Sequence, residues 1–262
     1  MKFIDCHVHC FPDSLAEKAV ANLAEAYKLQ PSFNGTIAGL IRQMDEMGIQ
    51  ASFIQCVATK PSQVPSINNW LAEVKSERLV PFGAIHPDFP NPEAELCRMR
   101  KLGIKGIKLH GNWQGFRPDD KRMIPIYQAA QENFIMYFHA GGEIVDSLEV
   151  LATPEALGHV RRMFPRLRMV CAHMGGYKMW NEVEKHLLGT DVYFDVSYCF
   201  PKDMPDDQMV KYIRMHGAEK ILFGSDSPCG HPKPQMDRLL SLPITDEEKE
   251  LIAWKNAVQL LS

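Results

Sequence analysis

Two histidines near the start of the chain stand two residues apart in the segment FIDCHVHC, residues 3–10. Side chains alternate between the faces of a β-strand, so we expect His7, His9 and the preceding Asp5 to share one face of a first strand. Polar side chains that point into a protein interior need partners or a ligand. Neutral imidazoles and a carboxylate suit zinc, iron or manganese, so this spacing predicts a metal centre.

The elements that would position these residues follow from the apolar pattern of the rest of the chain. Short β-rich apolar runs predict eight strands, at residues 2–9, 51–58, 79–85, 104–110, 134–140, 167–173, 192–198 and 221–226. Helical spacing predicts helices between them, at 36–48, 91–103, 123–132, 153–164, 180–188 and 206–217, and a closing helix or helix pair at 246–261. The segments 199–207 and 227–235 are expected to be long loops.

Eight strand–helix units are the number found in a (β/α)8 TIM barrel. We therefore expect residues 1–262 to form one α/β domain of this kind, with extra C-terminal helices. The alternative is a doubly wound open sheet, which would usually bring a glycine-rich phosphate-binding turn after the first strand. The segment CHVHCFPDS at that position contains no glycine.

Half of the ten histidines end predicted strands, and these five are His7, His9, His110, His139 and His173. Asp226 ends the eighth strand, and Lys108 lies two residues before His110 on the same face. The carboxyl ends of barrel strands meet at one rim, where active sites of this fold occur. We interpret the other histidines as surface or structural residues, namely His86, His159, His186, His216 and His231.

The composition argues against several classes of partner. The net charge is −3 and no basic run is present, so we do not expect nucleic acid to bind. No apolar run reaches the roughly 18 residues of a membrane span. Seven scattered cysteines without a CxxC pair indicate reduced thiols in the cytoplasm. Cys6 and Cys10 are interpreted as packing residues that face away from the histidines, and a homo-oligomer is left open.

The segments DCHVH, FHAGG, CAHMGG and LFGSDSP together resemble motifs of the amidohydrolase superfamily. Specifically, the whole chain resembles the amidohydrolase-related family of metal-dependent hydrolases and decarboxylases. The resemblance implies a distorted barrel that holds a divalent metal, commonly zinc. It also implies four metal ligands and a fifth residue, His173, beside the metal, where it helps bind a second ion or acts on substrate and water. The implied ligands are His7, His9, His139 and Asp226.

The number of ions depends on the fourth strand. In two-metal relatives a lysine on this strand is carboxylated and bridges the ions, a role open to Lys108. Decarboxylase-like members lack this lysine, and Lys108 could instead pair with Asp5 or with a substrate carboxylate. We expect one ion rather than two. Lys108, His110 and His173 are therefore candidates for either a second metal or the substrate.

These residues predict a hydrolase in which metal-activated water attacks a small-molecule amide, ester or lactone. Asp226 would accept the water proton, and His173 would stabilise the oxyanion or orient the substrate. The loops after the strands are expected to bind the substrate through Trp113, Arg117 and Tyr198. The alternative is non-oxidative decarboxylation of an aromatic or unsaturated acid, which an acid-binding Arg117 would favour. A third reading is a zinc-binding barrel without enzymatic activity.

Overall fold

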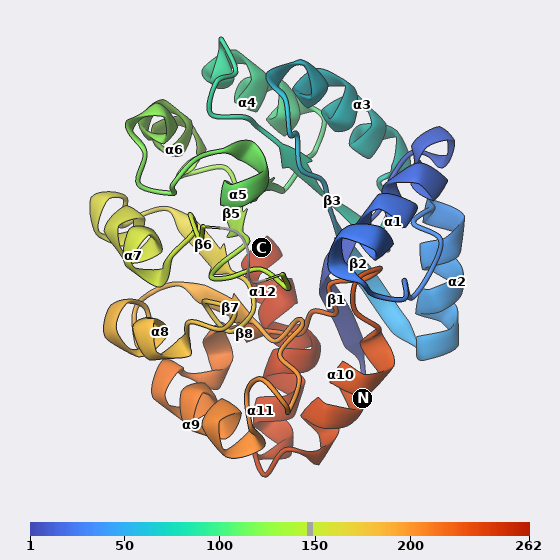
Figure 1. Ribbon diagram of the computed structural model, residues 1–262, viewed down its shortest axis with the longest axis vertical. Helices are drawn as coiled ribbons and strands as arrows, with labels where there is room; N and C mark the ends of the chain where they lie inside the picture. Colours follow the sequence, from blue (N-terminus) through green and yellow to red (C-terminus); the bar gives the residue numbers. More distant parts are fainter. Residues whose placement is uncertain (146–148) are drawn as a thin grey trace.

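Eight parallel strands curl into a nearly closed barrel in the computed structural model, which describes residues 1–145 and 149–262 (Figure 1). The strands pair in sequence order, so the doubly wound alternative, whose strand order reverses within the sheet, is excluded. The predicted (β/α)8 barrel is confirmed. The strands are β1 Phe3–His9, β2 Ile49–Gln55, β3 Leu79–Ala84, β4 Gly106–Leu109, β5 Ile135–Phe138, β6 Arg168–Cys171, β7 Tyr193–Asp195 and β8 Ile221–Leu222.

Helices surround the barrel (Figure 1). They are α1 Asp13–Tyr27, α2 Ile37–Met47, α3 Val64–Val74, α4 Pro92–Lys101, α5 Gly111–Gln114, α6 Ile124–Ala130, α7 Pro154–Met163, α8 Trp180–His186, α9 Asp206–His216, α10 Pro232–Ser241, α11 Asp246–Glu250 and α12 Asn256–Leu261. Short 3₁₀ segments lie at Pro61–Gln63, Lys121–Met123 and Ala218–Lys220, and a π-helical segment lies at Leu251–Lys255. None of the helices in the described ranges is both long enough and apolar enough to cross a membrane.

Capping residues set the helix ends where the sequence predicted them. The Thr36 hydroxyl accepts a hydrogen bond from the Gly39 amide at the start of α2, and Gly48, with φ of 69°, ends the helix. The expected loop 227–235 is partly wrong, because α10 begins at Pro232. Proline suits the first turn of a helix because it has no backbone N–H, and an N–H in that turn would have no partner within the helix.

The barrel interior is filled by apolar side chains from strands all around the sheet. Phe53, Phe82, Tyr137 and Leu222 come from four different strands and belong to one buried cluster. Gly106 makes room for this layer, because a Cβ atom at that position would lie 2.2 Å from the Phe82 ring. The C-terminal helix α12 adds Ala257 and Leu260 to the same cluster, and it therefore covers one end of the barrel.

An extra residue in β1 changes which side chains face the interior. Asp5 pairs with Ser52 and Val8 with Ile54, so three steps along β1 match two steps along β2. Cys6 consequently packs inside the barrel with Phe53, and the expectation that it faces outward is wrong. The expected common face of Asp5 with His7 and His9 is also wrong. The Asp5 carboxylate instead accepts hydrogen bonds from the Ser225 amide (2.9 Å) and hydroxyl (2.6 Å).

The chain that follows β8 closes the barrel against β1. The Cys6 amide donates to the Phe223 carbonyl at 2.9 Å, the Asp226 amide to the His7 carbonyl at 2.9 Å, and the His9 amide to the Ser227 carbonyl at 2.7 Å. We call these three bonds the closing seam. Because the seam runs through Asp226, the contacts that complete the barrel also place this carboxylate beside both histidines of the first motif.

His216, at the end of α9, is a buried histidine outside the cavity whose protonation affects the stability of the fold. Its ring stacks on Phe194 at 3.9 Å, donates to the Val192 carbonyl at 2.8 Å, and accepts from the Gly189 amide. Burial lowers the pKa of His216 to about 4, so the ring is neutral in the folded protein at neutral pH. The unfolded chain takes up a proton there below pH of about 6.5, and stability is therefore lost as the pH falls towards 4.

We predict that His216→Gln removes this pH dependence. The difference in unfolding free energy between wild type and His216→Gln should shrink by about 2 kcal/mol between pH 7.5 and pH 5. Urea denaturation at both pH values measures it, and His231→Gln, on an exposed histidine before α10, is the control. An unchanged difference would show that His216 binds its proton equally in both states.

Candidate active site

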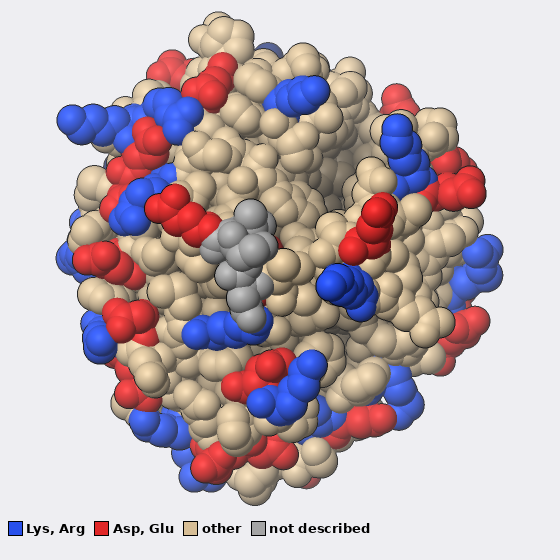
Figure 2. All heavy atoms as spheres, in the orientation of Figure 1, with Lys and Arg blue, Asp and Glu red and all other residues tan. Residues whose placement is uncertain are grey.

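A cavity of about 810 Å³ opens at the carboxyl ends of the strands. Figure 2 shows this face of the molecule with a hollow whose walls carry few charged side chains. The predicted site residues that line it are His7, His9, Lys108, His110, Trp113, His139, His173, Tyr198 and Asp226. Arg117 is not among its described lining residues. Its half-exposed guanidinium pairs with Asp119 at 3.1 Å, so the structure does not support the expected contact with substrate.

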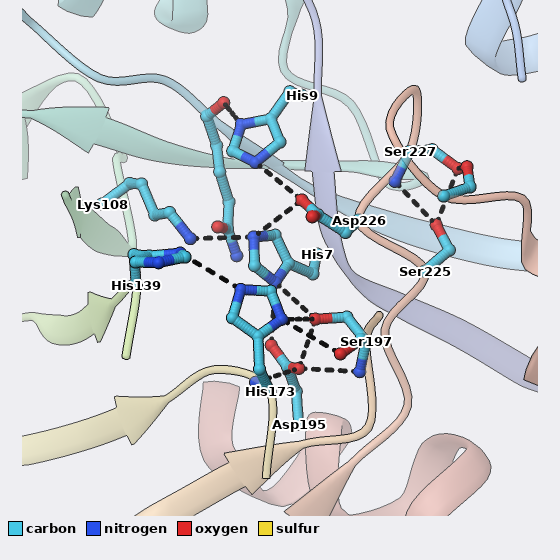
Figure 3. A network of polar contacts seen from close by, with 12 residues as sticks. His7, His9, Lys108, His139, His173, Asp195, Ser197, Ser225, Asp226 and Ser227 are labelled. Atoms are coloured by element: carbon cyan, nitrogen blue, oxygen red, sulfur yellow. Dashed lines mark hydrogen bonds and ion pairs between the residues drawn. The ribbon is translucent and has the colours of Figure 1, made fainter. Parts of the chain in front are cut away.

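Neighbouring acceptors fix the tautomers of His7 and His9. The His7 Nδ1–H donates to the Asp195 carboxylate at 2.9 Å, and the His9 Nδ1–H donates to the Gln55 carbonyl at 3.0 Å. The Nε2 atom of each ring therefore carries a lone pair. Both Nε2 atoms face the same oxygen, Asp226 Oδ1, at 3.3 Å from His7 and 3.2 Å from His9 (Figure 3).

A second pair of imidazole nitrogens meets in the same way. The His173 Nδ1–H donates to the Ser197 carbonyl at 3.0 Å, and the His139 Nε2–H donates to the Gly142 carbonyl at 3.1 Å. The remaining nitrogens, His173 Nε2 and His139 Nδ1, face each other at 3.2 Å (Figure 3). With these tautomers neither nitrogen carries a proton to share.

Lone pairs that face one another repel unless a proton or a cation lies between them. Burial and the neighbouring Lys108 lower the pKa of His7 to about 4, and burial and His173 hold the pKa of His139 well below its usual range. Burial opposes ionisation of Asp226, but the adjacent His7 and His9 outweigh it and keep the pKa of that carboxyl below its usual range. A divalent cation between His7, His9 and Asp226 would satisfy the two Nε2 lone pairs and the carboxylate oxygen, so this donor set fits a metal ion.

Lys108 reaches the same cluster from β4. It is 1% exposed, and its Nζ donates to His7 Nε2 at 2.8 Å. Burial lowers the pKa of Lys108 to about 8, although Asp226 and Asp195 oppose the change. The expected alternative partner Asp5 is engaged by Ser225 instead. The bridging role of a carboxylated Lys108 stays a prediction.

Glu143 is a site residue that the sequence reasoning missed. Its Oε1 lies 3.6 Å from His139 Nε2 and 3.7 Å from His110 Nε2, and burial raises the pKa of Glu143 to about 7. The His110 ring stacks on His139 at 4.1 Å with 10° between the planes. Lone pairs in separate parallel planes do not converge on one ion. This arrangement favours a proton-exchanging carboxyl group over a second metal site, and the signal in the sequence was an acid four residues after His139.

Asp195, at the end of β7, was also missed, and it organises the whole cluster. Its buried carboxylate accepts hydrogen bonds from His7 Nδ1, from the Tyr137 hydroxyl at 2.5 Å, from the Ser197 hydroxyl at 2.5 Å and from the His173 amide at 3.0 Å. Burial opposes its ionisation, but His7 outweighs this and keeps the pKa of Asp195 below its usual range. An acid inside the apolar run VYFDVSY was the available signal.

Backbone geometry confirms how tightly the site is built. His173 and Asp226 have φ angles of 58° and 61°, in the left-handed region that residues other than glycine rarely adopt. Between β8 and Asp226, a Cβ atom at Gly224 would lie 3.0 Å from His7 Cβ, so only glycine fits without movement. The fold therefore maintains conformations that bring these two side chains into the cavity.

The family follows from the sequence together with this geometry. The profile of a family described as Amidohydrolase matches residues 4–262. The chain belongs to the amidohydrolase family. No curated protein matches this amidohydrolase significantly.

Solved structures similar to this amidohydrolase cover almost the whole chain. An uncharacterised TIM-barrel protein from Bordetella bronchiseptica is 19% identical, with a TM-score of 0.78 over 100% of this chain and 98% of its own. A 5-carboxyvanillate decarboxylase from Sphingomonas paucimobilis is 14% identical, with a TM-score of 0.73 over 99% and 98%. A dihydroxybenzoic acid decarboxylase from Polaromonas, with bound manganese and 2-nitroresorcinol, is 18% identical, with a TM-score of 0.71 over 99% and 96%. At these identities the likeness shows the fold alone.

We predict that His7→Ala combined with His9→Ala removes most of the divalent metal from the purified protein. Two of the converging nitrogens are lost, so the metal content measured by elemental analysis should fall from about one ion per chain to a small fraction of that. His9→Ala alone, on the more exposed ring, should weaken binding in the same direction. His159→Ala with His186→Ala, two histidines outside the cavity, is the matched control. Unchanged metal in the His7/His9 variant would refute the site.

We predict that Asp195→Asn weakens metal binding by about 10- to 100-fold. An amide that donates to His7 Nδ1 would move the ring proton to Nε2 and block the lone pair. Competition with a chromophoric chelator measures the affinity. Tyr137→Phe removes a second hydrogen bond to the same carboxylate oxygen but keeps the ring that packs on His7, and it should change affinity by less than about threefold. Equal losses in both variants would mean that Asp195 stabilises the fold without orienting His7.

Proposed function

We propose that this amidohydrolase is a metal-dependent hydrolase that adds water to the carbonyl group of a small amide, ester or lactone, with Zn²⁺ as its ion. The observation that carries the proposal is the convergence of His7 Nε2, His9 Nε2 and Asp226 Oδ1 on one point of the cavity. The histidine-rich donor set suits zinc, although manganese also accepts such ligands. A divalent ion held there would polarise the carbonyl oxygen and lower the pKa of a water molecule.

The side chains of the site supply the proton transfers. Asp226 is ionised, so its carboxylate can accept the proton of the attacking water and pass it to the leaving group. His173 lines the cavity beside His139, where it would orient the substrate. Lys108 donates to the His7 Nε2 atom that would hold the ion, so a bound ion would replace this hydrogen bond and leave the ammonium to stabilise negative charge that develops on the substrate oxygen.

Glu143, beside His139 and His110, extends this chemistry. Its pKa of about 7 means that it both holds and releases a proton near neutral pH, as a general acid or base requires. The Tyr27 hydroxyl donates to its second oxygen at 3.3 Å and accepts from the Trp113 indole at 3.0 Å. Trp113 therefore helps to position Glu143 and also lines the cavity, which supports its proposed place at the substrate.

Two features favour hydrolysis over decarboxylation. Lys108 lies at the metal cluster, as expected of hydrolytic relatives, and Arg117, the side chain expected to hold the carboxylate of an acid, lies outside the cavity. Decarboxylation of an aromatic acid is the second candidate. Aromatic side chains line the cavity, including Trp70, Trp113 and Tyr198, and two of the similar folds described above are named as decarboxylases of aromatic acids.

We predict that Asp226→Asn retains much of its metal but loses turnover by about 10²- to 10⁴-fold. The amide oxygen can still coordinate, whereas an amide is a poor proton acceptor. Steady-state kinetics on the best substrate, with metal content measured in parallel, tests this. Asp237→Asn, on the surface of α10, is the control and should behave as wild type. Near wild-type turnover in Asp226→Asn would contradict the proton-transfer role.

A substrate panel in heavy-oxygen water separates the two reaction classes. Hydrolysis of an ester, amide or lactone places the label in the new carboxylate and releases no carbon dioxide. We expect this outcome. Carbon dioxide released from hydroxybenzoates, with no label incorporated from any carbonyl substrate, would replace the hydrolase with the decarboxylase.

A further inference from the structure

Helix α1 presents an apolar face to the cavity instead of to the barrel. The residues of α1 that line the cavity recur at helical spacing, and they are Leu15, Ala19, Asn22, Leu23, Ala26 and Tyr27. A different pair, Ala16 and Val20, is buried against the rest of the protein. The charged residues of α1 lie off the cavity face. Apart from Asn22 and the Tyr27 hydroxyl this face is apolar, and Leu15, which is 56% exposed, lacks protein cover.

Helix α3 contributes a second face of the same kind. Ile67 and Trp70 of α3 supply its apolar part, and the uncharged Ser66 of α3 and Gln63 of the preceding 3₁₀ segment line the same cavity beside them. Figure 1 shows α1 and α3 next to each other at the barrel mouth. We call the part of the cavity between these two faces the side arm. The side arm joins the region of His7, His9 and Asp226 at the end of β2 and in the segment that follows it. Gln55, Val57 and Thr59 line the wall there.

The charges of the cavity are confined to its floor. Among the described lining residues, the charged side chains are Lys108, Glu143 and Asp226, from β4 and from the segments that follow β5 and β8. Neither α1 nor α3 adds a charged side chain to the lining. A ligand that fills both regions therefore has a polar reacting group at one end and an uncharged apolar chain at the other.

We propose that the side arm binds an apolar acyl or alkyl chain of the substrate, so that the hydrolysed amide, ester or lactone belongs to an amphipathic molecule with an uncharged tail. The proposal rests on the proposed function for the reacting group and on the two helix faces for the tail. Two apolar faces that meet across solvent gain free energy when an apolar chain displaces the water between them. The tail would also position the carbonyl group over His7, His9 and Asp226.

Straight-chain alcohols test the side arm without any catalysis. Titration calorimetry of the metal-loaded protein with 1-butanol, 1-hexanol, 1-octanol and 1-decanol should show affinity rising by up to about fourfold for each added methylene. Leu23→Asp places a carboxylate in the arm and should reduce 1-octanol affinity by at least tenfold. Leu240→Asp, an exposed leucine on α10 outside the cavity, is the matched control and should bind like wild type. No increase in affinity with chain length, or equal losses in both variants, would overturn the proposal.

A series of p-nitrophenyl esters with acyl chains of two to ten carbons then links the arm to the reaction. We expect kcat/KM to rise with chain length in wild type and Leu240→Asp, and we expect the loss in Leu23→Asp to grow with chain length. Alcohol binding without ester or amide hydrolysis would support the arm and refute the proposed function. Hydrolysis without chain-length dependence would refute the arm and leave the function standing.

A second copy of the chain could cover the same faces, and analytical ultracentrifugation distinguishes this case. If Leu23→Asp converts a dimer to a monomer and alcohol affinity does not depend on chain length, the side arm is a subunit interface and the proposal is wrong. A monomer that binds longer alcohols more tightly supports the substrate tail.

Discussion

The closing seam between β1 and the chain after β8 is the constraint on which the site depends. Barrel closure requires backbone bonds between the first strand and the last, and here those bonds involve Cys6, His7, His9 and Asp226 themselves. The carboxylate of Asp5 reinforces the seam by accepting two hydrogen bonds from Ser225. A shift along this seam would separate Asp226 from the two imidazoles, so barrel closure and site assembly are one structural event.

One buried carboxylate, that of Asp195, holds several polar groups beside the seam in place. Asp195 satisfies His7, Tyr137, Ser197 and the His173 amide with one carboxylate, and these contacts fix which nitrogens can bind a ligand. The charged side chains of the cavity lie at its floor, and α1 and α3 supply uncharged, largely apolar walls. This separation allows one cavity to combine a strongly polar reaction centre with an apolar binding region.

The sequence predicted what depends on repeated local patterns. Alternating strands and helices, the helix end at Gly48, and the histidines at strand ends all have local signals, and the barrel brings those histidines together. The bulge in β1 has no comparable signal, because it depends on register with β2, and it reversed the expected orientations of Asp5 and Cys6. Asp195 was missed because its partners His7 and Tyr137 lie far away in the sequence. The contact of Glu143 with Tyr27 is equally distant in sequence, and Arg117 pairs with the nearby Asp119 instead of lining the cavity.

Anomalous X-ray diffraction from crystals of the purified protein tests the central claim most directly. Data collected on both sides of the absorption edge of the bound metal identify the element and its position. The account predicts a peak about 2.0–2.2 Å from His7 Nε2, His9 Nε2 and an Asp226 oxygen. A map without a peak at this point, or with a peak only between His110, His139 and Glu143, would contradict it.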